Sequence, residues 1–286
     1  MLKSFVVFAR FYLFWIIFFF LDRLIFLIYF FDKLANVSFK ETSSTFWNAL
    51  RLDASMIAYI SAIPFLGYLI LLFLPRFNFP KSIARTFVIF LLVIFSLISV
   101  FNLNLYREWG SKINYRSLDL SFNSSKEAVA SGSSSPIWSS LGILFIMLGG
   151  AFFLSIKVID YKIYDRAAST VIKISTVIIA LPILFLIVRG GWQLSPINQS
   201  MAYFSTKTVL NHAAVNTEWN LIQDVISNKY GNDNPYKYYN NEEAKRIVAE
   251  LFVKPTEKPV RVLKPGQPNI VFIILESFTA EFVESL

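Results

Sequence analysis

Long apolar segments separated by short polar connections fill the first two-thirds of the chain. A helix needs about 20 apolar residues to cross roughly 30 Å of hydrocarbon, and five segments meet or approach that length. Because only helices and closed barrels satisfy backbone polar groups in lipid, all five are expected to be transmembrane helices. They lie at residues 5–31, 56–74, 87–105, 137–156 and 171–188.

The charges of the connecting segments predict the orientation of these helices. The second connection contains Arg76, Lys81 and Arg85 and no acidic residue, and the fourth is also mainly basic. The first and third connections mix both signs of charge. Since basic residues flank membrane helices on the cytoplasmic side, the N-terminus and the two basic connections are expected in the cytoplasm. After five crossings, everything beyond Val188 is then expected on the outer face.

The chain changes character after the fifth apolar segment, and residues 189–268 are polar and lack a long apolar run. Apolar residues recur at near-helical spacing over 206–229, which predicts one or two amphipathic helices. Another short helix is expected at 241–252, after the turn-forming sequence of residues 231–235. Four prolines then indicate an extended tether, and they lie at Pro255, Pro259, Pro265 and Pro268.

The composition supports a membrane protein and argues against other classes. Hydrophobic residues make up 55% of the chain and charged residues 16%, whereas a soluble domain carries about 25% charged residues. The net charge is +8, but the basic residues lie between apolar segments, so nucleic acid is not an expected partner. The chain has no cysteine, which excludes a disulfide framework and a Cys-based zinc site within it.

The last apolar run, residues 268–275, is rich in β-branched residues and predicts a buried parallel β-strand. It ends at Glu276, and open α/β sheets build their sites at the carboxyl ends of such strands. A carboxylate there suits a hard metal ion. The alternative is a carboxylate near the start of a following helix that Ser277 or Thr279 would cap. Since ten residues follow Glu276, an α/β domain cannot be completed, and the chain is expected to be an N-terminal fragment.

The run at residues 268–278 resembles the first strand of the alkaline phosphatase–sulfatase superfamily. Its ending, Leu-Glu-Ser-Phe at residues 275–278, is similar to the branch of the lipoteichoic acid synthases, which are membrane phosphoglycerol transferases. Residues 51–53, 106–110 and 189–193 are also similar to that family. The resemblance implies an α-helical polytopic membrane protein with five transmembrane helices (1–190), an extracellular helical linker (191–267) and the first β-strand of a truncated α/β sulfatase-like domain (268–286).

On this resemblance, Glu276 corresponds to the first ligand of a divalent metal ion, with Mn²⁺ or Mg²⁺ favoured and Zn²⁺ as the alternative. The family's nucleophilic threonine and its other ligands lie further along, so no catalytic residue is assigned and the chain alone is expected to be inactive. The implied reaction moves phosphoglycerol from a phosphatidylglycerol-like lipid, through that metal-activated threonine, to an envelope glycolipid or glycan. The implied location is the bacterial cytoplasmic membrane.

Two other kinds of function stay open. Within the same superfamily, the chain could belong to a phosphoethanolamine transferase or a sulfatase. Outside it, the chain could be a non-enzymatic membrane scaffold or a transporter. Many transporters repeat glycine- or proline-broken spans in two halves, and this sequence shows no such repeat, which argues against a transporter.

Two arginines are candidates for lipid contacts. Arg51 and Arg189 lie at the expected outer ends of spans two and five. A guanidinium there matches the geometry of a lipid phosphate. For Arg189 the alternative is an interfacial anchor beside Trp192.

Other charged residues fall inside the apolar segments. Asp22 and Arg23 lie near the middle of the first expected span, where isolated charges are expensive. Pairing of Arg23 with Asp53 would hold spans one and two together or contact a headgroup. His212 is the only histidine of the chain, and we expect it to be a packed or surface residue.

Overall fold

The computed structural model describes residues 2–74, 80–123, 136–160, 169–229, 238–252 and 271. The chain divides into two compact units, Met1–Asn232 and Asp233–Leu286. Regular secondary structure in the described residues is entirely helical.

Five helices of the first unit are long and apolar enough to cross a membrane, which confirms the five expected spans. The chain is therefore a multi-pass membrane protein. The helices are α1 (Leu2–Tyr29), α2 (Phe39–Phe73), α3 (Lys81–Trp109), α6 (Ile137–Val158) and α7 (Thr170–Arg189).

The helices differ in length, and the difference shows which of them extend beyond the hydrocarbon. α6 has 22 residues and α7 has 20, and at 1.5 Å per residue each matches roughly 30 Å of hydrocarbon. α2 has 35 residues, or about 52 Å. We expected its span to begin at residue 56, but the helix begins at Phe39, where Ser38 accepts a hydrogen bond from the Glu41 amide. Its first part therefore extends past the end of α7, where Ser55 bonds Val188.

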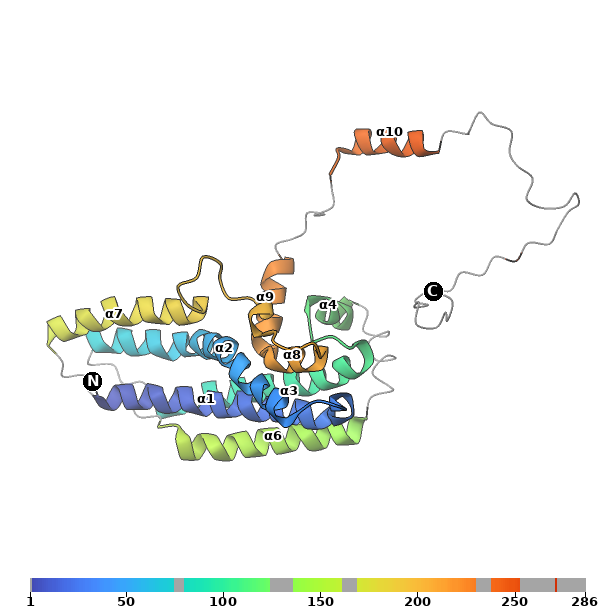
Figure 1. Cartoon of the computed structure of the whole chain (residues 1–286). Helices are drawn as coiled ribbons and strands as arrows, with labels where there is room; N and C mark the ends of the chain where they lie inside the picture. Colours follow the sequence, from blue (N-terminus) through green and yellow to red (C-terminus); the bar gives the residue numbers. More distant parts are fainter. Residues whose placement is uncertain are drawn as a thin grey trace, which may run out of the picture. The chain divides into compact units, whose positions relative to one another are not determined.

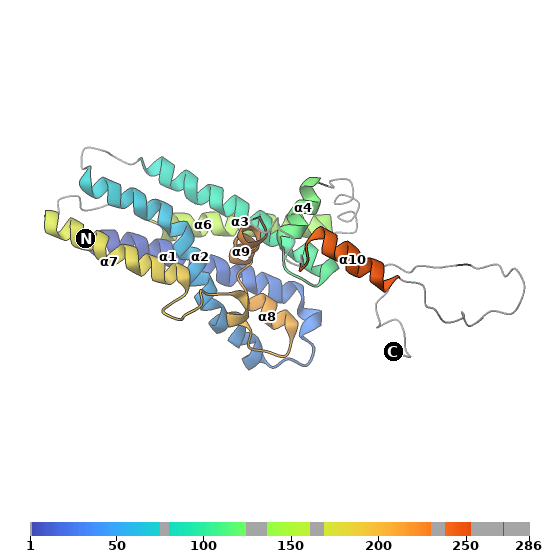
Figure 2. The ribbon, with the colours of Figure 1, turned by 90° about the horizontal axis from the view of Figure 1, so that it is seen from above.

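The five helices pack side by side, with α7 along α2 and α6 along α1 and α3 (Figures 1 and 2). Aromatic rings fill the centre, where Trp15 and Phe95 meet edge to face with centroids 5.4 Å apart. α7 lies at the margin, because none of its residues is buried. Its main contact is with α2.

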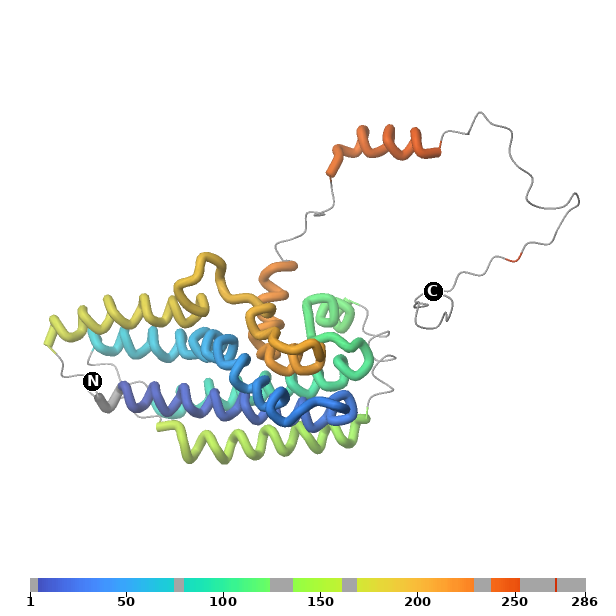
Figure 3. The backbone as a smooth tube through the Cα atoms, viewed as in Figure 1, coloured from blue at the N-terminus to red at the C-terminus, as the bar shows by residue number. Residues whose placement is uncertain are grey.

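After α7 the chain turns back onto the bundle through η2 (Gln199–Ala202), as the tube in Figure 3 shows. Two helices follow, α8 (Thr208–Ala214) and α9 (Thr217–Lys229), which confirms the amphipathic helices expected over 206–229. They pack against α1, α2 and α3, and Leu210 and Trp219 are buried there. We call this the capped end of the bundle. It is the end at which α1, α3 and α7 finish and α2 begins.

Three short elements complete the first unit. The 3₁₀-helix η1 (Phe31–Leu34) connects α1 to α2, and α4 (Tyr115–Asn123) follows α3 and packs on α9. We expected residues 191–267 to form a linker. α8 and α9 belong to the first compact unit, which extends to Asn232, and the bounds of the linker stay a prediction.

The second unit contains one described helix, α10 (Asn241–Leu251), which confirms the helix expected at 241–252. The Asn240 side chain caps it by accepting from the Glu243 amide. Of the final segment only Val271 is described, and it has no regular secondary structure. The expected strand at 268–275 and the expected metal ligand Glu276 otherwise lie outside the described residues.

Candidate functional site

Arg51 joins α2 to the chain reversal that follows α7. Its Nη2 donates to the Gly190 carbonyl at 2.9 Å and to Oε1 of Gln193 at 3.2 Å. Its Nε and Nη1 form no hydrogen bond within the described part of the chain, and the side chain is exposed. Part of this guanidinium is therefore free to bind an anion.

The reversal itself depends on two glycines. Gly190 has a φ of +83° and Gly191 a φ of +126°, a region that other residues enter only with strain. A Cβ added to Gly190 would lie 2.5 Å from Cβ of Ile197. Ile197 is held there because its amide donates to the Arg189 carbonyl at 2.9 Å. The glycines thus allow the loop to close tightly against the end of α7.

Arg189 holds the same loop from inside. Its guanidinium donates to the carbonyls of Gly191, Gln193 and Leu194. These bonds occupy Nη1 and Nη2, so Arg189 has less capacity than Arg51 to bind a ligand. The loop it stabilises presents Trp192 and Leu194, which are 87% and 99% exposed.

A groove of about 290 Å³ lies between α2 and α7 beside Arg51. Aliphatic side chains and the two glycines of the loop form the rest of its lining, which consists of Ala54, Ile183, Leu186, Ile187, Gly190 and Gly191. Neither Arg51 nor Arg189 forms an ion pair with any described residue. The Nε2 of Gln193 is buried without a partner among those residues, and it is a further donor. An apolar groove with unneutralised cationic donors at its end suits an amphiphile with an anionic head.

A buried ion pair lies at the capped end next to this groove. Nη2 of Arg23 donates to Oδ1 of Asp53 at 2.9 Å. This ion pair joins α1 and α2, as one of the two hypotheses from the sequence predicted. Nε of Arg23 donates to the Ala213 carbonyl. Nδ2 of Asn216 donates to the same Asp53 oxygen. The pair therefore holds α1, α2 and the α8–α9 turn together.

Arg23 pairs with Asp53, which lies two residues before Ser55, and Ser55 bonds the last turn of α7 at Val188. The ion pair therefore lies beside the end of α7. That Asp22 and Arg23 lie near the middle of the first span stays a prediction.

Three more ionisable groups complete the buried cluster. Nζ of Lys112 donates to the carbonyls of His212 and Val215 at the end of α8. Oγ of Ser99 donates to Oε1 of Glu218 at 3.2 Å. The carboxyl group of Asp22 is close enough to Lys112 and Glu218 to interact electrostatically with both.

The buried cluster contains one more acidic group than basic groups. It contains three acids, Asp22, Asp53 and Glu218, and two bases, Arg23 and Lys112. Full ionisation would leave one uncompensated negative charge inside the protein, which is costly. A single bound proton makes the cluster neutral.

Burial shifts the pKa of three groups at the capped end. Desolvation, followed by the charge of Asp22, raises the pKa of Glu218 to about 8. Desolvation lowers the pKa of Lys112 to about 8. Desolvation and the charge of Lys112 lower the pKa of His212 to about 4. Burial therefore favours the protonated form of Glu218 at neutral pH.

His212 is a packed residue, as the sequence predicted. Its Nδ1 lies 3.0 Å from the Tyr106 hydroxyl, and the two rings meet edge to face. Glu276 lies outside the described residues, and within the described part no group of three or more His, Asp or Glu side chains could hold a metal ion.

Sequence reasoning missed several residues of this region. Lys112, Ser99 and Glu218 are isolated polar positions with no motif around them. The one available signal was the pair Asp22–Arg23, because two charges in an apolar segment require partners elsewhere. Gln193 belongs to a segment that resembled the transferase family, but nothing indicated its contact with Arg51.

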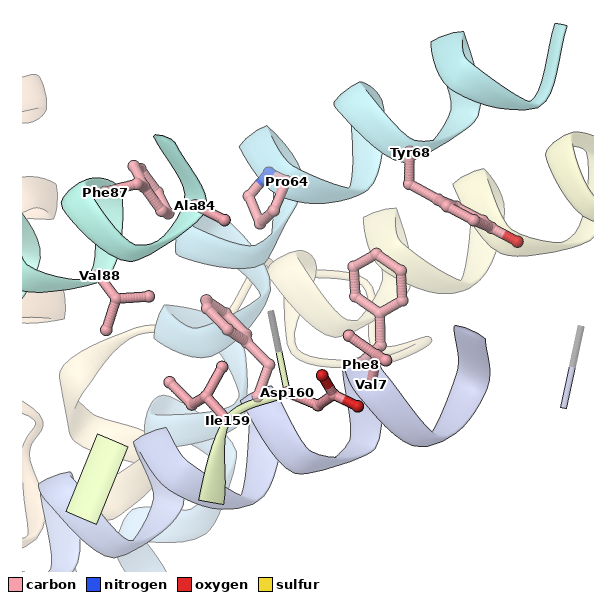
Figure 4. A pocket seen from close by; sticks show the side chains of 10 residues that line it. Val7, Phe8, Pro64, Tyr68, Ala84, Phe87, Val88, Ile159 and Asp160 are labelled. Carbon is pink, nitrogen blue, oxygen red and sulfur yellow. The ribbon is translucent and has the colours of Figure 1, made fainter. Parts of the chain in front are cut away.

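A second cavity lies near the opposite end of the bundle, where α1 begins (Figure 4). It measures about 80 Å³, and its walls are apolar except for Asp160 and the hydroxyl of Tyr68. Pro64 of α2 lines it, and a proline inside a helix removes one backbone hydrogen bond and favours a kink. With so few polar groups to orient a ligand, we assign this cavity no function.

Comparison with protein-family models, curated proteins and solved structures found no match to the chain. The resemblance to membrane phosphoglycerol transferases therefore depends on the motifs quoted above. The function has to be argued from the site itself.

Proposed function

We propose that this chain is the membrane portion of an envelope transferase that uses a phospholipid donor, and that Arg51 binds the lipid phosphate. The observation that carries the proposal is the exposed guanidinium of Arg51. It has no carboxylate partner among the described residues and stands at the end of an apolar groove. A phosphatidylglycerol-like lipid would place its phosphate on Arg51 and one acyl chain in the groove.

The level of the groove supports this assignment. Four of the six tryptophans lie at the capped end and are at least 40% exposed, namely Trp47, Trp109, Trp138 and Trp192. Exposed tryptophans concentrate where lipid headgroups meet water. Trp192 lies in the loop whose glycines line the groove, which supports a groove that opens at headgroup depth.

In this proposal the capped end faces the outside of the bacterial cytoplasmic membrane. The basic second and fourth connections would then lie in the cytoplasm. Glu276 would hold a divalent metal in a catalytic domain attached through α10, and phosphoglycerol would pass to an envelope glycolipid or glycan. A phosphoethanolamine transferase would use the same phosphate contact, because both headgroups are linked through a phosphate.

Lipid binding by the purified chain in detergent tests the proposal. Native mass spectrometry would compare phosphatidylglycerol with diacylglycerol, which has the same tails and no phosphate. We expect a clear preference for phosphatidylglycerol. The substitution Arg51→Gln should weaken its binding about 10- to 100-fold, since bonds to a charged group contribute roughly 1.5–3 kcal/mol. Arg116→Gln, at an exposed arginine of α4, is the matched control. Equal binding of both lipids, or unchanged binding by Arg51→Gln, would refute the assignment.

The orientation has its own test. The chain contains no cysteine, so single cysteines report accessibility without background. Ser195→Cys, in the exposed loop after α7, should react with a membrane-impermeant maleimide on intact cells. Ser82→Cys, at the start of α3, should react only after permeabilisation. The reverse pattern would place the groove on the cytoplasmic side and contradict the proposal.

A further inference from the structure

α7 packs along α2, and polar contacts join the two helices near the last turn of α7. At the capped end, Oγ of Ser55 donates to the Val188 carbonyl at 2.6 Å. One turn earlier on α2, Arg51 bonds the Gly190 carbonyl. These contacts set the distance between α2 and α7, and thus the width of the groove.

Ser55 is itself held by α9. Nε1 of Trp219 donates to Oγ of Ser55 at 3.1 Å, and both side chains are buried. Because the hydroxyl accepts from the indole, its single hydrogen is directed to the Val188 carbonyl. A continuous chain of hydrogen bonds therefore runs from α9 through α2 to the last turn of α7. We call Trp219, Ser55 and Val188 the relay.

The relay begins at the buried charge cluster. Oδ1 of Asn216 accepts from the Trp219 amide, and Nδ2 of Asn216 donates to Asp53. The position of Trp219 is thus fixed by the ion pair that docks α8 and α9 on the bundle. No part of the relay touches the groove directly.

We infer that Ser55 and Trp219 are positioning residues for the lipid-phosphate site, through which the docked α9 sets the spacing of α2 and α7. The inference rests on the proposed function for the identity of the ligand. It adds that headgroup binding depends on a helix that makes no contact with the lipid. If packing alone positioned α7, Trp219→Phe would leave lipid binding unchanged, because phenylalanine preserves most of the ring's volume.

Two substitutions remove the relay, and the chain offers a matched control for each. Trp219→Phe and Ser55→Ala delete one hydrogen-bonding group each. Trp15→Phe and Ser61→Ala delete the same groups where each is buried without a partner among the described residues. The double variant Trp219→Phe/Ser55→Ala tests whether the two side chains act as one unit.

Phosphatidylglycerol binding by native mass spectrometry is the first measurement. Each relay variant should lose about 2- to 10-fold in affinity, the range that one neutral hydrogen bond gives. The double variant should lose no more than the larger single loss, because residues in one network are not additive. The controls should bind as the unchanged chain does. Binding by Trp219→Phe equal to that of the unchanged chain, or additive losses, would overturn the inference.

A distance measurement keeps the two proposals distinguishable. Spin labels at Ile63→Cys of α2 and Ile179→Cys of α7, both at exposed positions, report the spacing of the helices without any lipid. The distribution should broaden in both relay variants and stay narrow in both controls. Broadening without any lipid preference would support the relay and refute the lipid assignment. An unchanged distribution would refute the relay whatever the lipid result.

Discussion

Arg23 of α1 donates from Nη2 to Oδ1 of Asp53 of α2 at 2.9 Å, with both side chains at most 4% exposed. The remaining donors of the guanidinium reach the carbonyls of Ala213 and Phe19. A buried charge pair contributes little net stability by itself, but losing one partner leaves the other charge uncompensated. The pair therefore acts mainly to specify how α1, α2 and α8 meet.

Removing the carboxylate of this pair should destabilise the bundle strongly. Asp53→Ala leaves Arg23 buried without its counterion and is expected to lower the free energy of unfolding by about 3–5 kcal/mol. Thermal unfolding followed by tryptophan fluorescence in detergent measures the loss. Asp119→Ala, at an exposed bond to Asn123, is the control and should change little.

Exchanging the two charges tests how specific the geometry is. In Arg23→Asp/Asp53→Arg the pair is restored in reverse. An arginine on α2 would have to reach the Ala213 carbonyl that Arg23 reaches from α1. We expect at most partial recovery of stability. Complete recovery would show that charge pairing alone matters at this position.

Glu218 should make docking of α9 depend on pH. Burial raises its pKa from an ordinary 4.5 to about 8. Between these values the docked chain keeps a proton that the unfolded chain has lost, so stability falls as pH rises and levels off above about 8. Glu218→Gln, which keeps the shape of the protonated group, should remove this fall.

Two neighbours restrict the window in which the effect is clean. His212, with its pKa lowered from 6.5 to about 4, makes stability rise with pH across that range. Lys112, with its pKa lowered from 10.5 to about 8, makes stability rise above about 8. The fall due to Glu218 should therefore be clearest between pH 6.5 and 8. A transition temperature that is flat or rising across this interval would contradict the assignment of the proton.

The two helix-ending glycines should respond differently to alanine. Gly110 and Gly190 both have positive φ, at +64° and +83°. A Cβ at Gly110 meets no atom within 4 Å, so Gly110→Ala should cost only the backbone strain of roughly 1–2 kcal/mol. Gly190→Ala adds the 2.5 Å clash with Ile197 and should displace the loop. Lipid binding should survive the first change and fall with the second, and equal behaviour would argue against a tight reversal after α7.

Lys112 should stabilise the end of α8. Its Nζ donates to two buried carbonyls, at 3.1 Å to His212 and 2.7 Å to Val215. Lys112→Met preserves the stem and leaves these carbonyls without a donor, at a cost of about 1–3 kcal/mol. The change should also increase proteolysis between α8 and α9. Unaltered cleavage there would mean that packing alone holds the turn.

The spans were predictable because hydropathy depends on local composition. Residues 87–105 and 137–156 fall within α3 and α6 for that reason. The start of α2 was missed because Phe39 to Ser55 mixes polar and apolar residues. The periodicity at 206–229 predicted α8 and α9, but an apolar face does not reveal what covers it. Their docking on the bundle therefore emerged only in the structure.

The site was predictable in part. The pair Arg23–Asp53 was identified, since charges near apolar segments are expensive enough to need a reason, and the role of Arg51 stays a prediction. Their partners were not, because Gly190 and Ala213 contribute backbone carbonyls, and any residue carries one. Ser55 and Trp219 have the same difficulty, since a serine and a tryptophan in such segments are ordinary. Long-range pairing of this kind leaves no local pattern in a single sequence.

The separation of 190 residues between Arg23 and the Ala213 carbonyl bears on how the protein is made. The first helix leaves the ribosome with its aspartate and arginine long before Ala213 has been synthesised. Until four more helices have crossed the bilayer, those charges remain in contact with water or with the insertion machinery. The bundle is therefore complete only after α8 has been synthesised. A ribosome stalled before α8 would release an unfinished bundle for quality control to remove.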